Sequence, residues 1–105
     1  MMAAKEGLLY RVARTSPVNE QIRALAKKAV SAGIDQEFFR AMREVVEQLQ
    51  TRPLEWGDPE RRTRKKGGWV CHGVRPPVIV YYVVYEPERA VCILRVRPLP
   101  GSPLE

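Results

Sequence analysis

The chain has 105 residues, of which 45% are hydrophobic and 29% are charged, and its formal net charge at neutral pH is +6. This composition is ordinary for a folded globular protein and excludes collagen-like and disordered chains. The longest apolar run, residues 78–85, is far shorter than the roughly 20 residues that span a bilayer, so we expect a cytoplasmic protein with no membrane partner. The pI of about 9.7 favours encounters with polyanions such as nucleic acid.

The first expected elements are a short strand and two helices. Residues 8–14, LLYRVAR, alternate between two faces and predict a strand. Ser16 is expected to cap the first helix, and Gly33 is expected to end it in the left-handed conformation. Asp35 is expected to cap the second helix, and Pro53 limits its far end. Because two or three residues join the helices, the sequence predicts an antiparallel helical hairpin with apolar faces to bury.

The second half of the chain predicts a β-meander. A polar loop, residues 53–68 (PLEWGDPERRTRKKGG), comes first, and its Trp56 is expected either to hold the loop against the helices or to stack on a base. Residues 69–74, 78–85 and 90–97 are rich in β-branched and aromatic side chains and are separated by RPP and EPER. These features predict three antiparallel strands.

The expected fold class is therefore α+β, with an N-terminal strand, a helical hairpin and a three-stranded meander that completes one sheet. The helices are expected to pack on one face of that sheet. We expect one domain over residues 1–105, with an irregular tail over residues 98–105 that contains three prolines.

Turn lengths predict which side chains share a face of the sheet. If EPER closes a tight hairpin, Tyr82 opposes Ile93, and if RPP is a three-residue turn, His72 opposes Val80. Four side chains are then expected on the face away from the helices: His72, Tyr82, Arg95 and Arg97. Four others are expected in the core: Trp69, Cys71, Tyr81 and Leu94. One bulge in either hairpin would move a strand's side chains to the opposite face.

The outward group has the chemistry that RNA cleavage by a 2′-hydroxyl requires, namely a proton acceptor, a proton donor and a cation for the phosphorane charge. His72 is the only histidine in the chain, and histidine is the side chain that titrates near neutral pH. The candidate catalytic residues are His72, Tyr82, Arg95 and Arg97. The alternative interpretation, a structural histidine in an ordinary strand, stays open.

A basic run, RRTRKK at residues 61–66, lies just before the meander. Such side chains release condensed counterions when they bind a phosphate backbone. The candidate nucleic-acid-binding residues are Arg61, Arg62, Arg64, Lys65, Lys66 and Arg75. The run could equally be a solvated loop that keeps the protein soluble.

The sequence predicts no cofactor and no metal site. Cys71 and Cys92 are the only cysteines, and the expected register separates them by a whole strand, which is too far for a disulfide. Together with His72 they lack the paired spacing of zinc ligands.

Three segments of the chain resemble the RelE/ParE superfamily of bacterial type II toxins, over roughly residues 8–99. They are LLYRVARTSPVNEQIRALAKKA, FFRAMREVVEQLQTRPLEWGD and VIVYYVVYEPERAVCILRVRPL. The shared features are a helical hairpin ending in an L…P…G loop and an aromatic strand that turns through acidic residues into the next strand. The resemblance implies a toxin that a cognate antitoxin wraps and neutralises. In this superfamily the RelE branch cuts messenger RNA on the ribosome, and the ParE branch inhibits DNA gyrase.

The residues of the ribonuclease branch are matched only in part. The run 61–66 corresponds loosely to that branch's basic loop, and Arg97 lies near its terminal arginine, although no tyrosine follows. Its central-strand arginine falls at Ile79 or Val80, so Arg75 would have to substitute. Together with the basic run and the outward group, the resemblance implies a toxin-like protein that is a ribosome-associated mRNA endonuclease. The alternatives are a non-catalytic gyrase inhibitor and a basic module that binds nucleic acid or protein.

Overall fold

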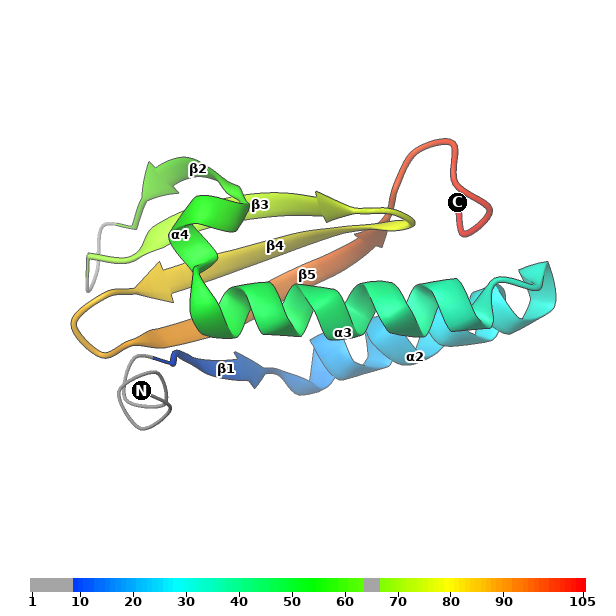
Figure 1. The fold of residues 1–105 in the computed structure, drawn as a ribbon, viewed down its shortest axis with the longest axis horizontal. Helices are drawn as coiled ribbons and strands as arrows, with labels where there is room; N and C mark the ends of the chain where they lie inside the picture. The colour runs from blue at the N-terminus through cyan, green and yellow to red at the C-terminus, as the bar shows by residue number, and fades with distance from the viewer. Residues whose placement is uncertain (1–8, 64–66) are drawn as a thin grey trace.

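The computed structural model describes residues 9–63 and 67–105 of the chain. In chain order the elements are β1 (Arg11–Arg14), α2 (Ser16–Ala32), α3 (Asp35–Thr51), α4 (Pro53–Trp56), β2 (Asp58–Arg62), β3 (Trp69–Arg75), β4 (Val78–Tyr85) and β5 (Ala90–Pro98). Within the described ranges the strands form one five-stranded sheet in the order β1-β5-β4-β3-β2. The helices α2 and α3 lie antiparallel on one face of it (Figure 1). The predicted α+β class is confirmed.

The helical hairpin forms as predicted, but its caps differ. Thr15, not Ser16, caps α2, and its hydroxyl accepts a hydrogen bond from a first-turn amide at 3.4 Å. Gly33 ends α2 in the left-handed conformation, with φ of 74°. The residue before α3 is Ile34, which makes no side-chain capping bond, so the prediction of an Asp35 cap is wrong. Asp35 is instead the first residue of α3, where its negative charge still favours the helix dipole.

The sheet contains the predicted meander and one strand that the sequence did not predict. Strands β3, β4 and β5 pair antiparallel, as expected. The predicted loop over residues 53–68 is not all loop, because it contains the single turn α4 and strand β2, which pairs antiparallel with β3. The first strand begins at Arg11, later than expected, and pairs parallel with β5. Residue 8 of the expected strand lies outside the described residues.

The register of the β3–β4 hairpin differs from the prediction by one residue. The turn contains two residues, since Arg75 opposes Val78 directly. His72 therefore opposes Tyr81, not Val80.

The β4–β5 hairpin contains a bulge. Near its turn the register is as expected, with Tyr82 opposite Ile93. Beyond that point Tyr81 opposes Arg95, so Leu94 is an extra residue on β5. A bulge places neighbouring residues on the same side of a strand, and Leu94 and Arg95 are indeed both exposed. Before the bulge the odd-numbered residues of β5, Val91 and Ile93, are buried, whereas after it the even-numbered Val96 is buried.

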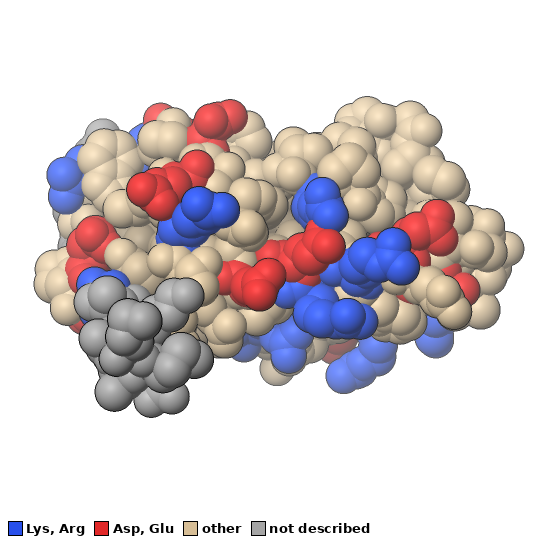
Figure 2. Space-filling model, viewed as in Figure 1, with Lys and Arg blue, Asp and Glu red and all other residues tan. Residues whose placement is uncertain are grey.

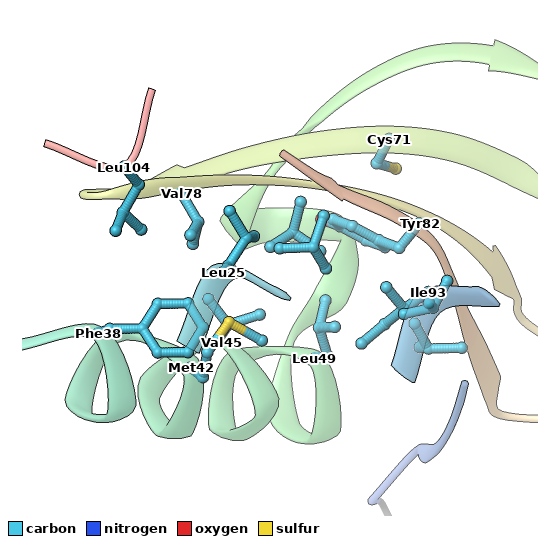
Figure 3. Close-up of a cluster of buried hydrophobic side chains, with 14 of the residues drawn as sticks. Leu25, Phe38, Met42, Val45, Leu49, Cys71, Val78, Tyr82, Ile93 and Leu104 are labelled. Carbon is cyan, nitrogen blue, oxygen red and sulfur yellow. The ribbon is translucent and has the colours of Figure 1, made fainter. Parts of the chain in front are cut away.

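The core lies between the sheet and the two long helices (Figure 3). Helix α3 contributes Phe38, Val45 and Leu49, which are completely buried, as predicted from its apolar stripe. The sheet contributes alternate residues of its central strands, among them Val80, Tyr82, Val84 and Ile93. No helix among the described residues is long and apolar enough to cross a membrane.

Pro98, the first residue of the expected tail, is the last residue of β5, and the residues after it pack closely on the domain. The backbone N–H of Leu99 donates to the carbonyl of Pro77 at 2.9 Å, which fixes the start of the tail beside the β3–β4 turn. Leu104 is completely buried next to Val78 and Phe38 at one end of the core (Figure 3).

Replacing Leu104 by alanine should lower the free energy of unfolding by about 2 kcal/mol, the low end of the range for buried leucines, because a tail can partly close over the gap. Urea unfolding followed by circular dichroism measures the change. The control is Leu94→Ala, because Leu94 is 46% exposed and its replacement should change stability little. Equal losses in the two variants would contradict the buried role of Leu104.

Candidate functional site

The sheet face turned away from α2 and α3, here called the outer face, brings together side chains from four adjacent strands. His72 on β3 opposes Tyr81 on β4, and Tyr81 opposes Arg95 on β5. Strand β2 adds Glu60, which lies at the irregularity between Pro59 and Arg61. We call Glu60, His72, Tyr81 and Arg95 the His72 cluster.

The closest contact of the cluster joins the imidazole of His72 to the carboxylate of Glu60. Nδ1 of His72 lies 2.6 Å from Oε2 of Glu60, and the two side chains are 35% and 38% exposed. Nδ1 itself is shielded from solvent, and the ring N–H and the carboxylate oxygen are not aligned as a hydrogen bond. The pair is thus a close contact between the ring nitrogen and a carboxylate oxygen. Because the carboxylate can accept only from Nδ1, it favours the tautomer that leaves Nε2 as the proton acceptor.

The aromatic ring of Tyr81 lies between His72 and Arg95. The guanidinium carbon of Arg95 lies 4.5 Å from the Tyr81 ring centroid, within the range of a cation–π contact. The imidazole and phenol rings have centroids 6.1 Å apart and are tilted by 35°. Stacking on the ring holds the flat guanidinium in one orientation and leaves its N–H groups available to an oxyanion. The outer face therefore presents a base, a hydroxyl and a fixed cation side by side.

Tyr82 does not share this face, and the prediction that it does is wrong. Its side chain is completely buried under the helical side of the sheet, and its hydroxyl donates to the carbonyl of Pro53 at 2.5 Å. Burial raises the pKa of the Tyr82 hydroxyl. The cause is the bulge at Leu94, which lets Ile93 and its partner Tyr82 turn into the core while Arg95 stays outside. Tyr81, expected in the core, takes its place on the outer face.

The remaining predicted catalytic residues do lie outside. His72 and Arg95 are neighbours of Tyr81, and Arg97 is exposed one alternation further along β5, opposite Ile79. His72 still shares a face with Arg95 because two one-residue differences from the predicted register cancel. One is the shorter β3–β4 turn and the other is the bulge on β5. Leu94, expected in the core, is exposed. The catalytic roles of these side chains stay a prediction.

Of the candidate nucleic-acid-binding residues that the structure describes, Arg75 lies apart from Arg61 and Arg62. Arg61 is exposed and opposes Val70, and Arg62 lies over the Trp69 ring, 4.8 Å from its centroid, with an N–H donating to the carbonyl of Gly67. Arg64, Lys65 and Lys66 lie outside the described residues. Arg75 points to the helical side and pairs with Glu44 of α3, so it does not join His72. Figure 2 shows acidic and basic side chains mixed over α3, so the helical side is not a uniformly basic patch.

Sequence reasoning missed Glu60, because its strand was assigned to a loop. The only local signal was the alternation of acidic residues at 58 and 60, which puts two carboxylates on one side of an extended segment. Within the part of the chain that the structure describes, no three His, Cys, Asp or Glu side chains gather as a metal site would require. Cys71, completely buried, points away from His72, and burial raises the pKa of its thiol.

The same fold occurs in a solved structure of a toxin–antitoxin complex. A chain of the toxin–antitoxin complex RelBE2 from Mycobacterium tuberculosis superposes with a TM-score of 0.59, and the match covers 86% of this chain and 91% of that chain. The two sequences are 22% identical over the match, so the likeness shows a shared fold. No family model matches the sequence, and no curated protein matches it either.

Proposed function

We propose that the chain is a toxin-like component of a bacterial type II toxin–antitoxin system that cuts messenger RNA on the ribosome through the His72 cluster. The observation that carries the proposal is the contact between Glu60 and His72 beside Arg95 on the sheet face turned away from α2 and α3. The fold shared with a chain of a toxin–antitoxin complex supports the same class of protein and a cognate antitoxin as its partner. Such a target places the activity in the cytoplasm.

The cluster supplies each group that transesterification needs. Nε2 of His72 takes the proton from the 2′-hydroxyl as the 2′-oxygen attacks phosphorus, while Glu60 holds the opposite ring nitrogen. Arg95 binds the non-bridging oxygens and stabilises the charge of the phosphorane. The bond from phosphorus to the 5′-oxygen breaks, and the Tyr81 hydroxyl donates the proton that the leaving oxygen needs. The products are a 2′,3′-cyclic phosphate and a 5′-hydroxyl end.

The test is to incubate the protein with translating ribosomes and to map the RNA ends that form. We expect new 5′-hydroxyl ends within the translated message, and far fewer on the same RNA without ribosomes. The matched control is Glu60→Gln, which keeps the size of the side chain but cannot stabilise the charged imidazole that forms during the reaction. It should yield fewer new 5′-hydroxyl ends than the wild type. An intact message at a molar excess of protein over ribosomes would refute the proposal.

Two exposed aliphatic side chains favour a second candidate, a non-catalytic protein that binds gyrase or another macromolecule through the outer face. Val74 and Leu94 are 48% and 46% exposed beside the His72 cluster, and RNA cleavage has no need of them. Apolar surface next to arginines is typical of protein interfaces. A DNA gyrase supercoiling assay separates the candidates, because inhibition with no RNA cleavage would select this one. Salt-sensitive nucleic-acid binding with neither activity would indicate a basic binding module.

A further inference from the structure

Helix α4 lies on the same side of the sheet as α3 and leads from α3 into β2 (Figure 1). Tyr82 holds it there from within the sheet. The Tyr82 hydroxyl donates to the carbonyl of Pro53, the first residue of α4, at 2.5 Å. The ring of Tyr82 stacks on Trp56, the last residue of α4, with centroids 5.9 Å apart and planes inclined by 24°. Both ends of this single turn thus contact one buried side chain.

Two glycines bring α4 and the following residue unusually close to β3. A Cβ atom on Gly73 would lie 2.3 Å from the ring of Trp56, so the indole occupies the space where a side chain of β3 would stand. A Cβ atom on Gly57 would lie 2.6 Å from the backbone oxygen of His72. The residue that follows the helix therefore lies against the backbone of His72. We call Pro53, Trp56 and Gly57, with Tyr82 and Gly73 beneath them, the α4 clamp.

Strand β2, which carries Glu60, begins at the residue after this clamp. All five residues of β2 are exposed, and the strand lies at the edge of the sheet with β3 as its neighbour. Its ladder is interrupted at Glu60 itself, between Pro59 and Arg61. The end of β2 after Glu60 is held by the stacking of Arg62 on Trp69 and by its hydrogen bond to the Gly67 carbonyl. The end before Glu60 follows directly from the α4 clamp, so the position of the Glu60 carboxylate depends in part on how α4 is anchored.

From these contacts we propose that Tyr82 is a positioning residue, whose hydroxyl, through α4, holds Glu60 against the imidazole of His72. It touches neither the imidazole nor any substrate, because it lies on the opposite face of the sheet. Its effect on catalysis rests on the proposed function, whereas its effect on the Glu60–His72 contact does not. A Tyr82 that is merely a core residue would affect stability and leave the imidazole unchanged.

The single histidine of the chain makes a direct test possible. The two imidazole ¹⁵N chemical shifts report which ring nitrogen carries the proton, and in this protein they arise from His72 alone. Glu60→Gln should weaken the preference for the Nδ1–H tautomer and defines the full effect. Tyr82→Phe keeps the ring and its stacking on Trp56 but removes the hydroxyl. It should move the shifts in the same direction as Glu60→Gln and by a smaller amount.

Two further variants exclude a general effect of losing a tyrosine hydroxyl. Tyr10→Phe removes another hydroxyl contact between residues far apart in the chain, from Tyr10 to Glu86, and should leave the imidazole shifts unchanged. The double variant Glu60→Gln/Tyr82→Phe should match Glu60→Gln, because a positioning residue has no effect once its target is lost. Unchanged shifts in a folded Tyr82→Phe protein, or additive changes in the double variant, would overturn the proposal.

The outcome is separable from that of RNA cleavage. In an active protein Tyr82→Phe should lower kcat by about tenfold to a hundredfold and leave KM nearly unchanged, since a displaced catalytic group loses alignment and not substrate binding. If no RNA is cleaved but the imidazole shifts change as expected, the positioning role stands and the proposed function fails. If RNA is cleaved and the imidazole shifts do not change, the proposed function stands and the positioning role of Tyr82 fails.

Discussion

Replacing His72 by glutamine should lower the rate of ribosome-dependent RNA cleavage by about a hundredfold to ten-thousandfold, the usual contribution of general acid–base catalysis. Glutamine has a similar reach and can stay beside Glu60, but its amide cannot accept a proton at neutral pH. Because the His72 side chain is 35% exposed, the substitution should leave the core and the stability of the domain intact. Single-turnover cleavage on stalled ribosomes measures the loss directly.

The control for His72→Gln is Tyr85→Phe, a substitution at the last residue of β4 that should keep full activity. A second comparison, Arg95→Lys, keeps the charge but loses the planar guanidinium that stacks on Tyr81. We expect it to reduce cleavage less than His72→Gln does, because a lysine still attracts phosphate without fixed orientation. Undiminished cleavage by His72→Gln would remove the imidazole from the mechanism and leave the arginines as a binding surface.

Replacing Gly57 by alanine should lower the free energy of unfolding by about 4 kcal/mol, an unusually large loss for the addition of one methyl group. The φ of Gly57 is −98°, which alanine adopts freely, so the loss comes from space alone. The new methyl would lie 2.3 Å from the Tyr82 hydroxyl and 2.6 Å from the His72 carbonyl oxygen. Overpacking costs about 1–3 kcal/mol, and forcing α4 away leaves the Tyr82 hydroxyl unpaired for a similar further amount.

Adding Tyr82→Phe to this variant shows which clash dominates. It removes the contact with the hydroxyl but not the one with the backbone oxygen of His72, so it should not restore stability. Amide hydrogen exchange should show the loss of protection concentrated in β2 and β3, with α2 less affected, because the clash lies at the β2–β3 edge. A Gly57→Ala protein as stable as the wild type would mean that α4 is not tightly held, and the positioning role of Tyr82 would fail with it.

The parts of the fold that sequence alone predicts are those with a periodic apolar pattern. The stripe through Phe38, Val45 and Leu49 predicts α3 because apolar residues recur there at helical spacing. Each of these three residues is completely buried in the structure. The runs that become β4 and β5 are apolar and bounded by turn residues, so their existence and their antiparallel order are predictable. Strand β2 is not predictable in this way, because its sequence, DPERR, is wholly exposed and has no apolar side to reveal it. An edge strand of this kind is defined by its neighbour and not by its own residues.

The candidate site depends on details that periodicity does not contain. Whether the β3–β4 turn has two or three residues, and whether Leu94 is an extra residue, each decides which face a strand presents. Tyrosine suits either face of a sheet, so the neighbouring Tyr81 and Tyr82 of β4 exchange their expected faces with no change in the apolar pattern. The pairing of Arg75 with Glu44 joins β3 to α3, residues 31 apart in the chain. Side chains brought together by such long-range contacts are visible only in three dimensions.

The parallel pair of β1 and β5 joins the two extremes of the chain, with Arg11 beside Ala90 and Val12 beside Val91. During synthesis the first strand leaves the ribosome long before its partner exists, and closing so long a loop is slow compared with forming the helical hairpin. Partly made chains therefore contain the two helices but lack a complete sheet. The outer face, including Arg95 on the same last strand, assembles only once β5 has emerged.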